Sequence, residues 1–214
     1  MDKGLGLTLK LPERKKYFKI FNLKMRNKFI SKNLQTFLKT LPILSAHVYS
    51  NSSVSLTVSE KRLLSSIFIL KNHANFQFKI LSCISGVDYP NKKRRFKIVY
   101  ELLSVRYNTR LTLKVFSDEI TPVSSLTSIF PAAGWYESEI WDMFGVFFIN
   151  HSNLTRLLTD YGFEGYPLRK DFPLSGFTEV SYDFIKKQVL KNKIELSQEL
   201  KTFKFSSPWE EIKL

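Results

Sequence analysis

Residues 76–116 read FQFKILSCISGVDYPNKKRRFKIVYELLSVRYNTRLTLKVF, and this stretch decides the fold. Apolar residues recur with the period of a β-strand along residues 76–85, 96–105 and 111–116, which predicts three strands. The sequence Asp-Tyr-Pro-Asn at 88–91 predicts a turn within the loop 87–94, and Asn-Thr at 108–109 predicts a hairpin turn. Strands joined by such short connections pair antiparallel, so we expect a mainly antiparallel sheet.

Helical patterns flank these strands. Residues 31–41 and 63–71 carry apolar side chains at helical spacing, and β-type residues lie between them over 48–58. Ser124 or Ser125 is expected to begin a short helix through residue 130, and a second helix follows Pro131 and ends near residue 144. Beyond it we expect a long irregular C-terminal segment, with one short helix within residues 182–200.

These elements predict an α+β fold, in which helices pack on one face of the sheet. The predicted organisation is a basic extension over residues 1–30, the α+β domain over 31–145, and an extended partner-binding segment and tail over 146–214.

The chain has 214 residues and a net charge of +14, which is spread unevenly. Residues 1–40 contain eleven Lys or Arg and two acids, whereas residues 134–176 contain six acids and three bases. A basic protein favours nucleic acid, anionic lipid or acidic protein surfaces as partners. The basic terminus and the run Lys-Lys-Arg-Arg at 92–95 therefore favour one alternative, a mitochondrial RNA-binding or ribosomal protein.

Metal and cofactor chemistry have little basis in the sequence. Cys83 is the single cysteine, which excludes an intramolecular disulfide and an iron–sulfur cluster held by this chain alone. His47, His73 and His151 are far apart and have no metal-ligand spacing, so a metalloenzyme using His151 is a weak alternative. The chain also has no Gly-rich nucleotide-binding motif.

Residues 134–176 read GWYESEIWDMFGVFFINHSNLTRLLTDYGFEGYPLRKDFPLSG and contain five of the eight glycines. A long, non-repetitive segment with so many glycines is typical of a functional region. Glu137, Glu139 and Asp142 lie on one predicted helix, and a buried carboxylate without a partner is very costly. We therefore expect cations to pair with these acids, and Arg is favoured because it forms two parallel hydrogen bonds.

This segment resembles the signature of a subunit family of respiratory complex I, the thirty-kilodalton subunit, which is called subunit 9 in mitochondria and has a bacterial counterpart. We call it the subunit 9 family. The residues that carry the resemblance are Trp135, Glu137, Glu139, residues 142–145, His151, Arg156, and residues 160–165 and 167–173. It extends to Val-Asp-Tyr-Pro at 87–90, Arg-Phe at 95–96 and Pro-Trp at 208–209, and covers about residues 45–214.

The resemblance implies a core subunit of the matrix-side peripheral arm of NADH:ubiquinone oxidoreductase, a proton-pumping complex. This chain would carry no catalytic, metal-binding or cofactor-binding residues, because other subunits would bind FMN, the iron–sulfur clusters and ubiquinone. Its partners would chiefly be the forty-nine-kilodalton, PSST-type and TYKY-type subunits, without nucleic acid. The location would be the matrix side of the mitochondrial inner membrane, and the scarcity of Ala suggests AT-rich coding, as in a mitochondrially encoded protein.

Nine residues are expected to form the structural or interface motif of this family: Trp135, Glu137, Glu139, Asp142, His151, Arg156, Arg169, Lys170 and Asp171. The chain departs from the family pattern at Ser138, at Ser-Asn 152–153 and at Thr155. Two of these departures, Ser138 and Thr155, remove an expected cation. We therefore expect Arg156, Arg169 or cations of a partner chain to complete the pairing of the acids.

Overall fold

The computed structural model describes residues 9–10, 41–48, 54–198, 201 and 203. The chain forms two compact units, residues 1–172 and residues 173–214, so residues 146–172 belong with the domain that precedes them. Three predicted segments lie wholly or mostly outside the described residues. They are the predicted helix over 31–41 except for Leu41, most of the basic extension over 1–30, and the end of the tail from residue 204 on.

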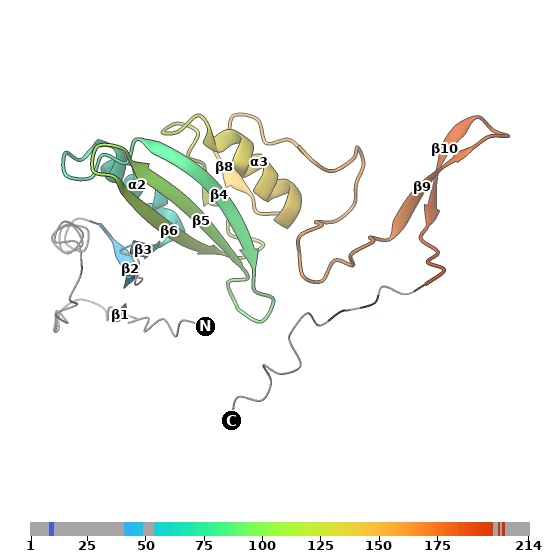
Figure 1. The fold of residues 1–214 in the computed structure, drawn as a ribbon, viewed down its shortest axis with the longest axis horizontal. Helices are drawn as coiled ribbons and strands as arrows, with labels where there is room; N and C mark the ends of the chain where they lie inside the picture. Colours follow the sequence, from blue (N-terminus) through green and yellow to red (C-terminus); the bar gives the residue numbers. More distant parts are fainter. Residues whose placement is uncertain (1–8, 11–40, 49–53, 199–200, 202, 204–214) are drawn as a thin grey trace, which may run out of the picture. The chain divides into compact units, whose positions relative to one another are not determined.

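A six-stranded sheet forms the centre of the first unit, with the strand order β1-β2-β3-β6-β5-β4 (Figure 1). Its strands are β1 (Leu9–Lys10), β2 (Ile43–Val48), β3 (Val54–Val58), β4 (Ile80–Asp88), β5 (Phe96–Ser104) and β6 (Thr109–Ser117). All neighbouring strands are antiparallel except β3 and β6, which are parallel. The sequence therefore predicts the mainly antiparallel sheet correctly, and the β3–β6 pair makes it a mixed one.

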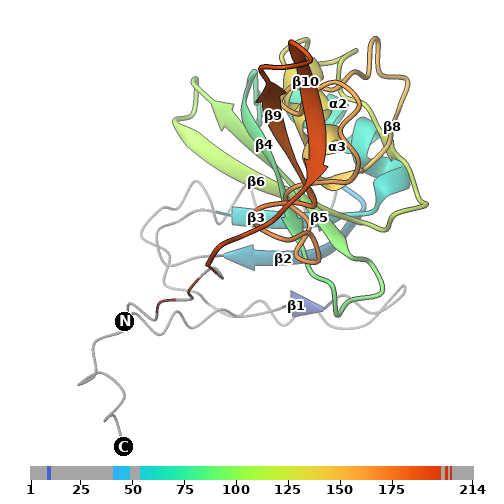
Figure 2. The ribbon, with the colours of Figure 1, turned by 90° about the vertical axis from the view of Figure 1, so that its right-hand side faces the viewer.

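The helices α2 (Leu63–Asn72) and α3 (Ala133–Phe144) lie on the same side of the strands (Figure 2). A short 3-10 helix, η1 (Glu60–Arg62), precedes α2. Every second residue of β5 is buried, from Phe96 to Ser104, and β6 alternates in the same way. These side chains share one core with the apolar residues of α2 and α3. This arrangement confirms the predicted α+β fold. None of the described helices is long and apolar enough to cross a bilayer.

The strand register brings three segments together at one end of the sheet. Asp88 at the end of β4 lies opposite Phe96 at the start of β5, and Phe96 lies opposite Ser117 at the end of β6. The C-terminal end of α3 is at the same place, because a Cβ atom on Gly86 would lie 2.6 Å from the Phe144 ring. The absence of a side chain at Gly86 therefore lets Phe144 pack directly against β4.

The first predicted strand begins too early. Residues 76–79 are not part of β4, which starts at Ile80, and Gln77 has a φ of 45°. Phe76 and Phe78 are buried beneath the turn that follows α2, where the Phe78 N–H donates to the Leu70 carbonyl at 3.0 Å. Their alternation thus reflects burial of a turn. The strand β2 begins at Ile43, whereas the sequence predicts β-type residues only from Val48 on.

The predicted helix over residues 124–130 is wrong. Val123–Ser124 is instead a short strand, β7, which pairs in parallel with β8 (Phe148–Ile149). The Ser125 N–H continues this pairing, because it donates to the Ile149 carbonyl at 2.9 Å. The Ser125 hydroxyl accepts the Thr127 N–H at 3.2 Å and donates to the Glu137 carboxylate at 2.6 Å, but only a turn follows it and no helix.

The second unit contains an antiparallel hairpin of β9 (Thr178–Asp183) and β10 (Gln188–Lys193), which corrects the predicted helix within residues 182–200. The Asp183 carboxylate accepts hydrogen bonds from the N–H groups of Ile185 and Lys186 at 2.8 and 3.2 Å. Such a side-chain-to-backbone bond fixes a turn. Large apolar side chains of the hairpin are exposed, including Val180, Tyr182, Phe184, Ile185 and Val189.

Candidate functional site

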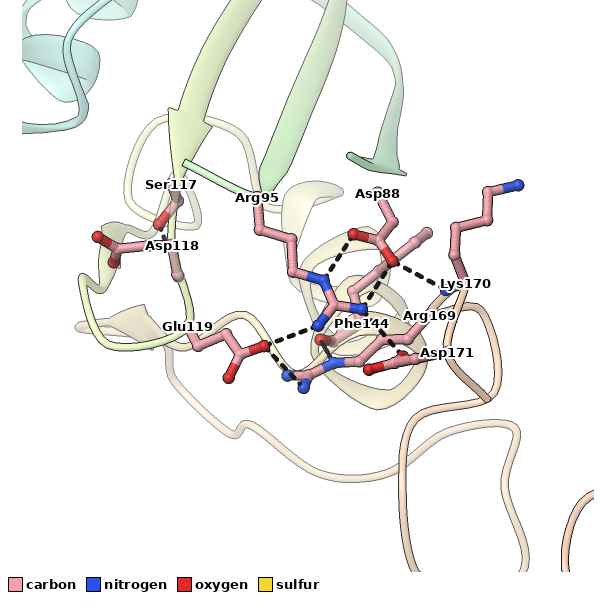
Figure 3. A network of polar contacts seen from close by, with 9 residues as sticks. All are labelled: Asp88, Arg95, Ser117, Asp118, Glu119, Phe144, Arg169, Lys170 and Asp171. Atoms are coloured by element: carbon pink, nitrogen blue, oxygen red, sulfur yellow. Dashed lines mark hydrogen bonds and ion pairs between the residues drawn. The ribbon is translucent and has the colours of Figure 1, made fainter. Parts of the chain in front are cut away.

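Asp88 and Arg95 face each other at the end of the sheet where β4 and β5 are joined (Figure 3). Arg95 Nε donates to Asp88 Oδ1 at 2.7 Å, and Nη2 donates to Oδ2 at 2.9 Å. The Asp88 side chain is completely buried, and the Arg95 side chain is 16% exposed. This is the bidentate geometry in which arginine binds a carboxylate most strongly.

Arg95 also connects two other segments of the chain. Its Nη1 donates to Glu119 Oε1 at 3.0 Å, and its Nη2 donates to Asp171 Oδ1 at 2.9 Å. Glu119 also accepts from Arg169 Nη1 at 3.2 Å. These five side chains, Asp88, Arg95, Glu119, Arg169 and Asp171, form what we call the charge cluster (Figure 3).

Two backbone contacts attach residues 169–171 to the same place. The Lys170 N–H donates to Asp88 Oδ2 at 2.8 Å, and Arg169 Nε donates to the Phe144 carbonyl at 2.8 Å. The second bond satisfies a carbonyl in the last turn of α3, which has no partner within the helix. The charge cluster therefore joins the sheet, the end of α3 and the segment before Pro173.

The charges of the cluster shift one another's protonation equilibria. The hydrogen bond from Arg95 holds the pKa of Asp88 below its ordinary value, although burial of the carboxylate opposes this effect. The same guanidinium lowers the pKa of Asp171, and the two carboxylates raise the pKa of Arg95. All three groups are therefore ionised at neutral pH, and the buried charge of Asp88 is compensated.

Aromatic rings and a glycine fix the position of Arg169. Its guanidinium carbon lies 4.4 Å from the centre of the Tyr166 ring and 5.1 Å from that of Phe96. Gly145 ends α3 with a φ of 78°, a conformation that favours glycine. A Cβ atom at this position would lie 2.7 Å from both Arg169 Nη2 and the Tyr166 ring, so glycine is also required for space.

Asp142 on α3 is buried, and its partners are backbone groups and one hydroxyl. Its Oδ2 accepts hydrogen bonds from three consecutive N–H groups, those of Leu157, Leu158 and Thr159, at 3.2, 2.8 and 2.9 Å. Its Oδ1 accepts from the Thr159 hydroxyl at 2.5 Å. Burial favours the neutral acid, yet these four hydrogen bonds lower the pKa of Asp142. This carboxylate thus fixes the loop over residues 157–159 to α3.

Glu137 is the second buried acid of α3. Its carboxylate accepts the Ser125 hydroxyl at 2.6 Å and the Leu126 N–H at 2.8 Å. Burial raises the pKa of Glu137, and these hydrogen bonds only partly offset that effect. The prediction that cations of this chain pair with the acids of α3 is therefore wrong for Glu137 and Asp142, which are satisfied mainly by N–H and hydroxyl donors.

His151 is oriented by two hydrogen bonds to the backbone. Its Nδ1 accepts the Asn153 N–H at 3.1 Å, and its Nε2 lies 3.1 Å from the Gly134 carbonyl. This pattern requires the neutral tautomer with the proton on Nε2, which then donates to Gly134. Glu137 Oε2 lies 3.8 Å from the same nitrogen. Within the described ranges, no three His, Cys, Asp or Glu side chains are placed to hold a metal ion.

Comparison with known proteins identifies the family. The family described as "Respiratory-chain NADH dehydrogenase, 30 Kd subunit" matches residues 56–178, which include the whole charge cluster. The chain belongs to this family.

Similar proteins include NADH-ubiquinone oxidoreductase subunit 9 of Reclinomonas americana, which is 50% identical over 190 residues. That alignment covers 88% of this chain and 93% of the relative. NADH dehydrogenase [ubiquinone] iron-sulfur protein 3 of Beta trigyna is 57% identical over 149 residues, covering 70% of this chain and 78% of the relative. The resemblance to the subunit 9 family is therefore confirmed.

A solved structure agrees with this assignment. A chain in the membrane-bound sulfane sulfur reductase, described as an archaeal respiratory membrane complex, superposes with a TM-score of 0.59 and 26% identity. The match covers 67% of this chain and 85% of the archaeal chain. The fold of the subunit 9 family therefore also occurs in a respiratory complex that is described as a sulfane sulfur reductase.

The nine predicted motif residues of this subunit 9 family member fall into three groups. Arg169 and Asp171 belong to the charge cluster, which Lys170 joins through its backbone N–H. Glu137, Asp142 and His151 form the internal anchors of α3. Three residues point outward: Trp135 is 70% exposed, Glu139 is exposed, and Arg156 lies 6.0 Å from the Trp141 ring.

The departures from the family pattern gather on one surface. Ser138, Ser152, Asn153 and Thr155 line the same pocket, together with Trp135 and His151, and its volume is about 530 Å³. Arg169 is committed to Glu119 and the Phe144 carbonyl, so it does not replace a missing cation there.

Three residues of the charge cluster were not among the predicted motif residues: Asp88, Arg95 and Glu119. Asp88 and Arg95 flank a predicted turn between two predicted strands, which places them close together. That proximity is the signal from which a pair could have been inferred. Nothing in the local sequence marks Glu119, which lies in the loop after β6.

Proposed function

We propose that this chain is a non-catalytic core subunit of the peripheral arm of NADH:ubiquinone oxidoreductase. In this role it supports electron transfer from NADH to ubiquinone by holding neighbouring subunits in place near the terminal iron–sulfur cluster and the quinone site. The flavin, the iron–sulfur clusters and ubiquinone are then bound by those neighbours, chiefly the forty-nine-kilodalton, PSST-type and TYKY-type subunits. The peripheral arm lies on the matrix side of the mitochondrial inner membrane.

The main support for this proposal is the set of ion pairs and hydrogen bonds that the charge cluster forms within the chain. Asp88, Arg95, Glu119, Arg169 and Asp171 bond to one another and to the backbone. Side chains that are bonded to one another in this way hold their segments in place, whereas a catalytic acid or base must reach a proton of the substrate. The motif therefore supports a structural role.

The first unit also exposes large apolar side chains, as expected for an interface. In the first unit, Trp135, Leu158 and Tyr161 are 70, 63 and 96% exposed. Side chains of this kind are enriched in protein interfaces, where aromatic residues contribute much of the binding energy. The β9–β10 hairpin adds further exposed apolar residues, and an isolated two-stranded hairpin is at best marginally stable in water. Both features favour burial against other subunits.

The RNA-binding alternative gains no support from the basic run at residues 92–95. Arg94 pairs with Glu60 at 3.0 Å, and Arg95 belongs to the charge cluster. Half of that run is therefore engaged within the chain and is not free to bind phosphate groups.

Trp135→Ala and Leu158→Ser test the proposal in cells that depend on the variant chain. The two side chains are exposed, so the isolated variants should unfold at nearly the wild-type temperature. The amount of assembled NADH dehydrogenase on native gels should fall several-fold, while the NADH:ubiquinone turnover per assembled complex stays unchanged. Exposed Lys61→Ala is the matched control, with normal assembly expected. Full assembly combined with lost turnover would instead assign this chain a direct chemical role.

A further inference from the structure

The face of the sheet opposite the helices carries a concentrated positive charge. Lys97 and Lys114 lie on this face, because the residues on either side of them in β5 and β6 are buried in the core. Phe116 lies opposite Lys97 in the strand register. Tyr89 and Lys92, from the turn between β4 and β5, extend the same surface. We call these five residues the Tyr89 face.

Tyr89 is the centre around which the lysines gather. Lys97 Nζ donates to the Tyr89 hydroxyl at 2.9 Å and lies 5.0 Å from the ring centre. Lys92 Nζ lies 4.2 Å from the same ring centre and 5.9 Å from that of Phe116. The ammonium group of Lys97 lowers the pKa of the Tyr89 hydroxyl, as do the charges of Lys92 and Lys114.

The charge of Lys92 and Lys97 is not neutralised within the part of the chain that the structure describes. Neither lysine forms an ion pair with any described carboxylate. Glu101 lies on the same face of β5, and it accepts a hydrogen bond from the Thr112 hydroxyl at 3.0 Å. Two ammonium groups held against one ring repel each other, and the ring itself offers each only about 0.5–1 kcal/mol at an exposed site.

We propose that the Tyr89 face binds a carboxylate-rich segment of a neighbouring protein subunit. A carboxylate placed between Lys92 and Lys97 relieves their repulsion and accepts hydrogen bonds from both ammonium groups. This inference rests on the proposed function, because it requires that the chain be built into a complex. It adds a second contact surface, on the side of the sheet away from α3 and the charge cluster.

The chemistry of the Tyr89 face favours an acidic protein segment over RNA. Single-stranded RNA binds through bases stacked on free aromatic rings, but two ammonium groups already lie against the Tyr89 ring. Arginine binds phosphate groups with two parallel hydrogen bonds, yet the nearby Arg94 and Arg95 are held by Glu60 and Asp88. Lysines are compact point charges on flexible stems, so this pair can bind carboxylates that a peptide presents in different orientations.

Zero-length crosslinking of the intact complex tests the contact directly. A carbodiimide joins an amine to a carboxylate only where the two are in contact. We expect amide links from Lys92 or Lys97 to Asp or Glu of another subunit, identified by peptide mass spectrometry. Acetylation of the same two lysines should be at least tenfold slower in the complex than in the isolated chain. No such link, together with equal acetylation in both states, overturns the proposal.

Charge reversal tests whether the contact matters for assembly. A Lys92→Glu/Lys97→Glu chain should enter the complex about tenfold less well than a co-expressed wild-type chain, corresponding to about 1.4 kcal/mol. Lys92→Arg/Lys97→Arg keeps the charge and should compete normally, as should Lys61→Glu, an exposed site elsewhere. Thermal unfolding of each isolated variant separates a folding defect from a docking defect.

The outcomes distinguish this inference from the proposed function. Failure of the wild-type chain to migrate with NADH dehydrogenase refutes the proposed function itself. If the wild-type chain migrates with NADH dehydrogenase and the Glu variant enters the complex equally well, only the proposal for the Tyr89 face is refuted. A third outcome would identify RNA as the ligand in place of an acidic segment. The wild-type chain would then bind a fluorescent RNA oligonucleotide in a salt-sensitive way, the Glu variant would not bind it, and no carbodiimide links would form.

Discussion

Removal of the Arg95 guanidinium should be among the most damaging single changes in this chain. The Asp88 carboxylate is completely buried in the wild-type chain, and Arg95→Ala leaves the Lys170 N–H as its remaining hydrogen-bond donor. Breaking a buried pair by removing one partner typically costs about 3–5 kcal/mol. For a chain of this size each kcal/mol corresponds to roughly 2–4 °C, so the midpoint of thermal unfolding should fall by about 10 °C.

Arg94→Ala is the matched control because it removes the adjacent arginine. The Arg94 side chain is 50% exposed and pairs with Glu60 near the surface, where an ion pair contributes only about 0–1 kcal/mol. Denaturant unfolding of the two purified variants should therefore differ by at least about 2 kcal/mol. A double-mutant cycle with Asp88→Asn should show that most of the Arg95 effect depends on the Asp88 charge.

The pH dependence gives a second, independent readout. The folded-state pKa of Asp88 is lowered, so its contribution to stability is fully present above the unfolded value and is lost as pH falls through the folded pKa. Without Arg95, burial becomes the dominant influence, and the pKa of Asp88 rises. The difference between wild type and Arg95→Ala should thus be largest near neutral pH and shrink below about pH 4. Equal, pH-independent losses for Arg94→Ala and Arg95→Ala would refute this account of the charge cluster.

Two further changes test the neighbouring anchors. Gly145→Ala should destabilise the chain by about 1–3 kcal/mol in denaturant unfolding, because it places an alanine at a positive φ and its Cβ 2.7 Å from neighbouring atoms. Gly134→Ala is the control. Its Cβ would have only ordinary contacts, the nearest at 3.6 Å, so this variant should be neutral or slightly stabilising. Glu137→Gln should remove one pH dependence. Because the folded-state pKa of Glu137 is raised, its contribution to stability is fully present below about pH 4.5 and is lost as pH rises through the folded pKa. An unchanged pH profile in the variant would assign this dependence to another group.

Regular alternation made the central strands predictable, and isolated features were less informative. The alternation along β5 and β6 extends over nine residues each, which is long enough to predict a half-buried strand. The shorter alternation of Phe76, Phe78 and Ile80 is equally regular, but only Ile80 is in the strand. The β9–β10 hairpin was harder to recognise because its turn places Phe184 and Ile185 next to each other, which interrupts the period of two.

The acids of α3 show why residue types in a motif predict importance better than they predict partners. Counting charges in residues 134–176 considers only side-chain cations, and it therefore predicts Arg156, Arg169, Lys170 or cations of a neighbouring chain as the partners of these acids. The structure instead gives Asp142 three consecutive backbone N–H groups and a hydroxyl, donors that only the path of the chain brings together. The arginine that does compensate a buried carboxylate, Arg95, lies outside that segment, and its bond to Asp171 joins residues 76 positions apart. Because N–H and hydroxyl donors already satisfy the two buried acids of α3, Glu137 and Asp142, their burial does not depend on cations at positions 138 and 155, which line the pocket beside His151.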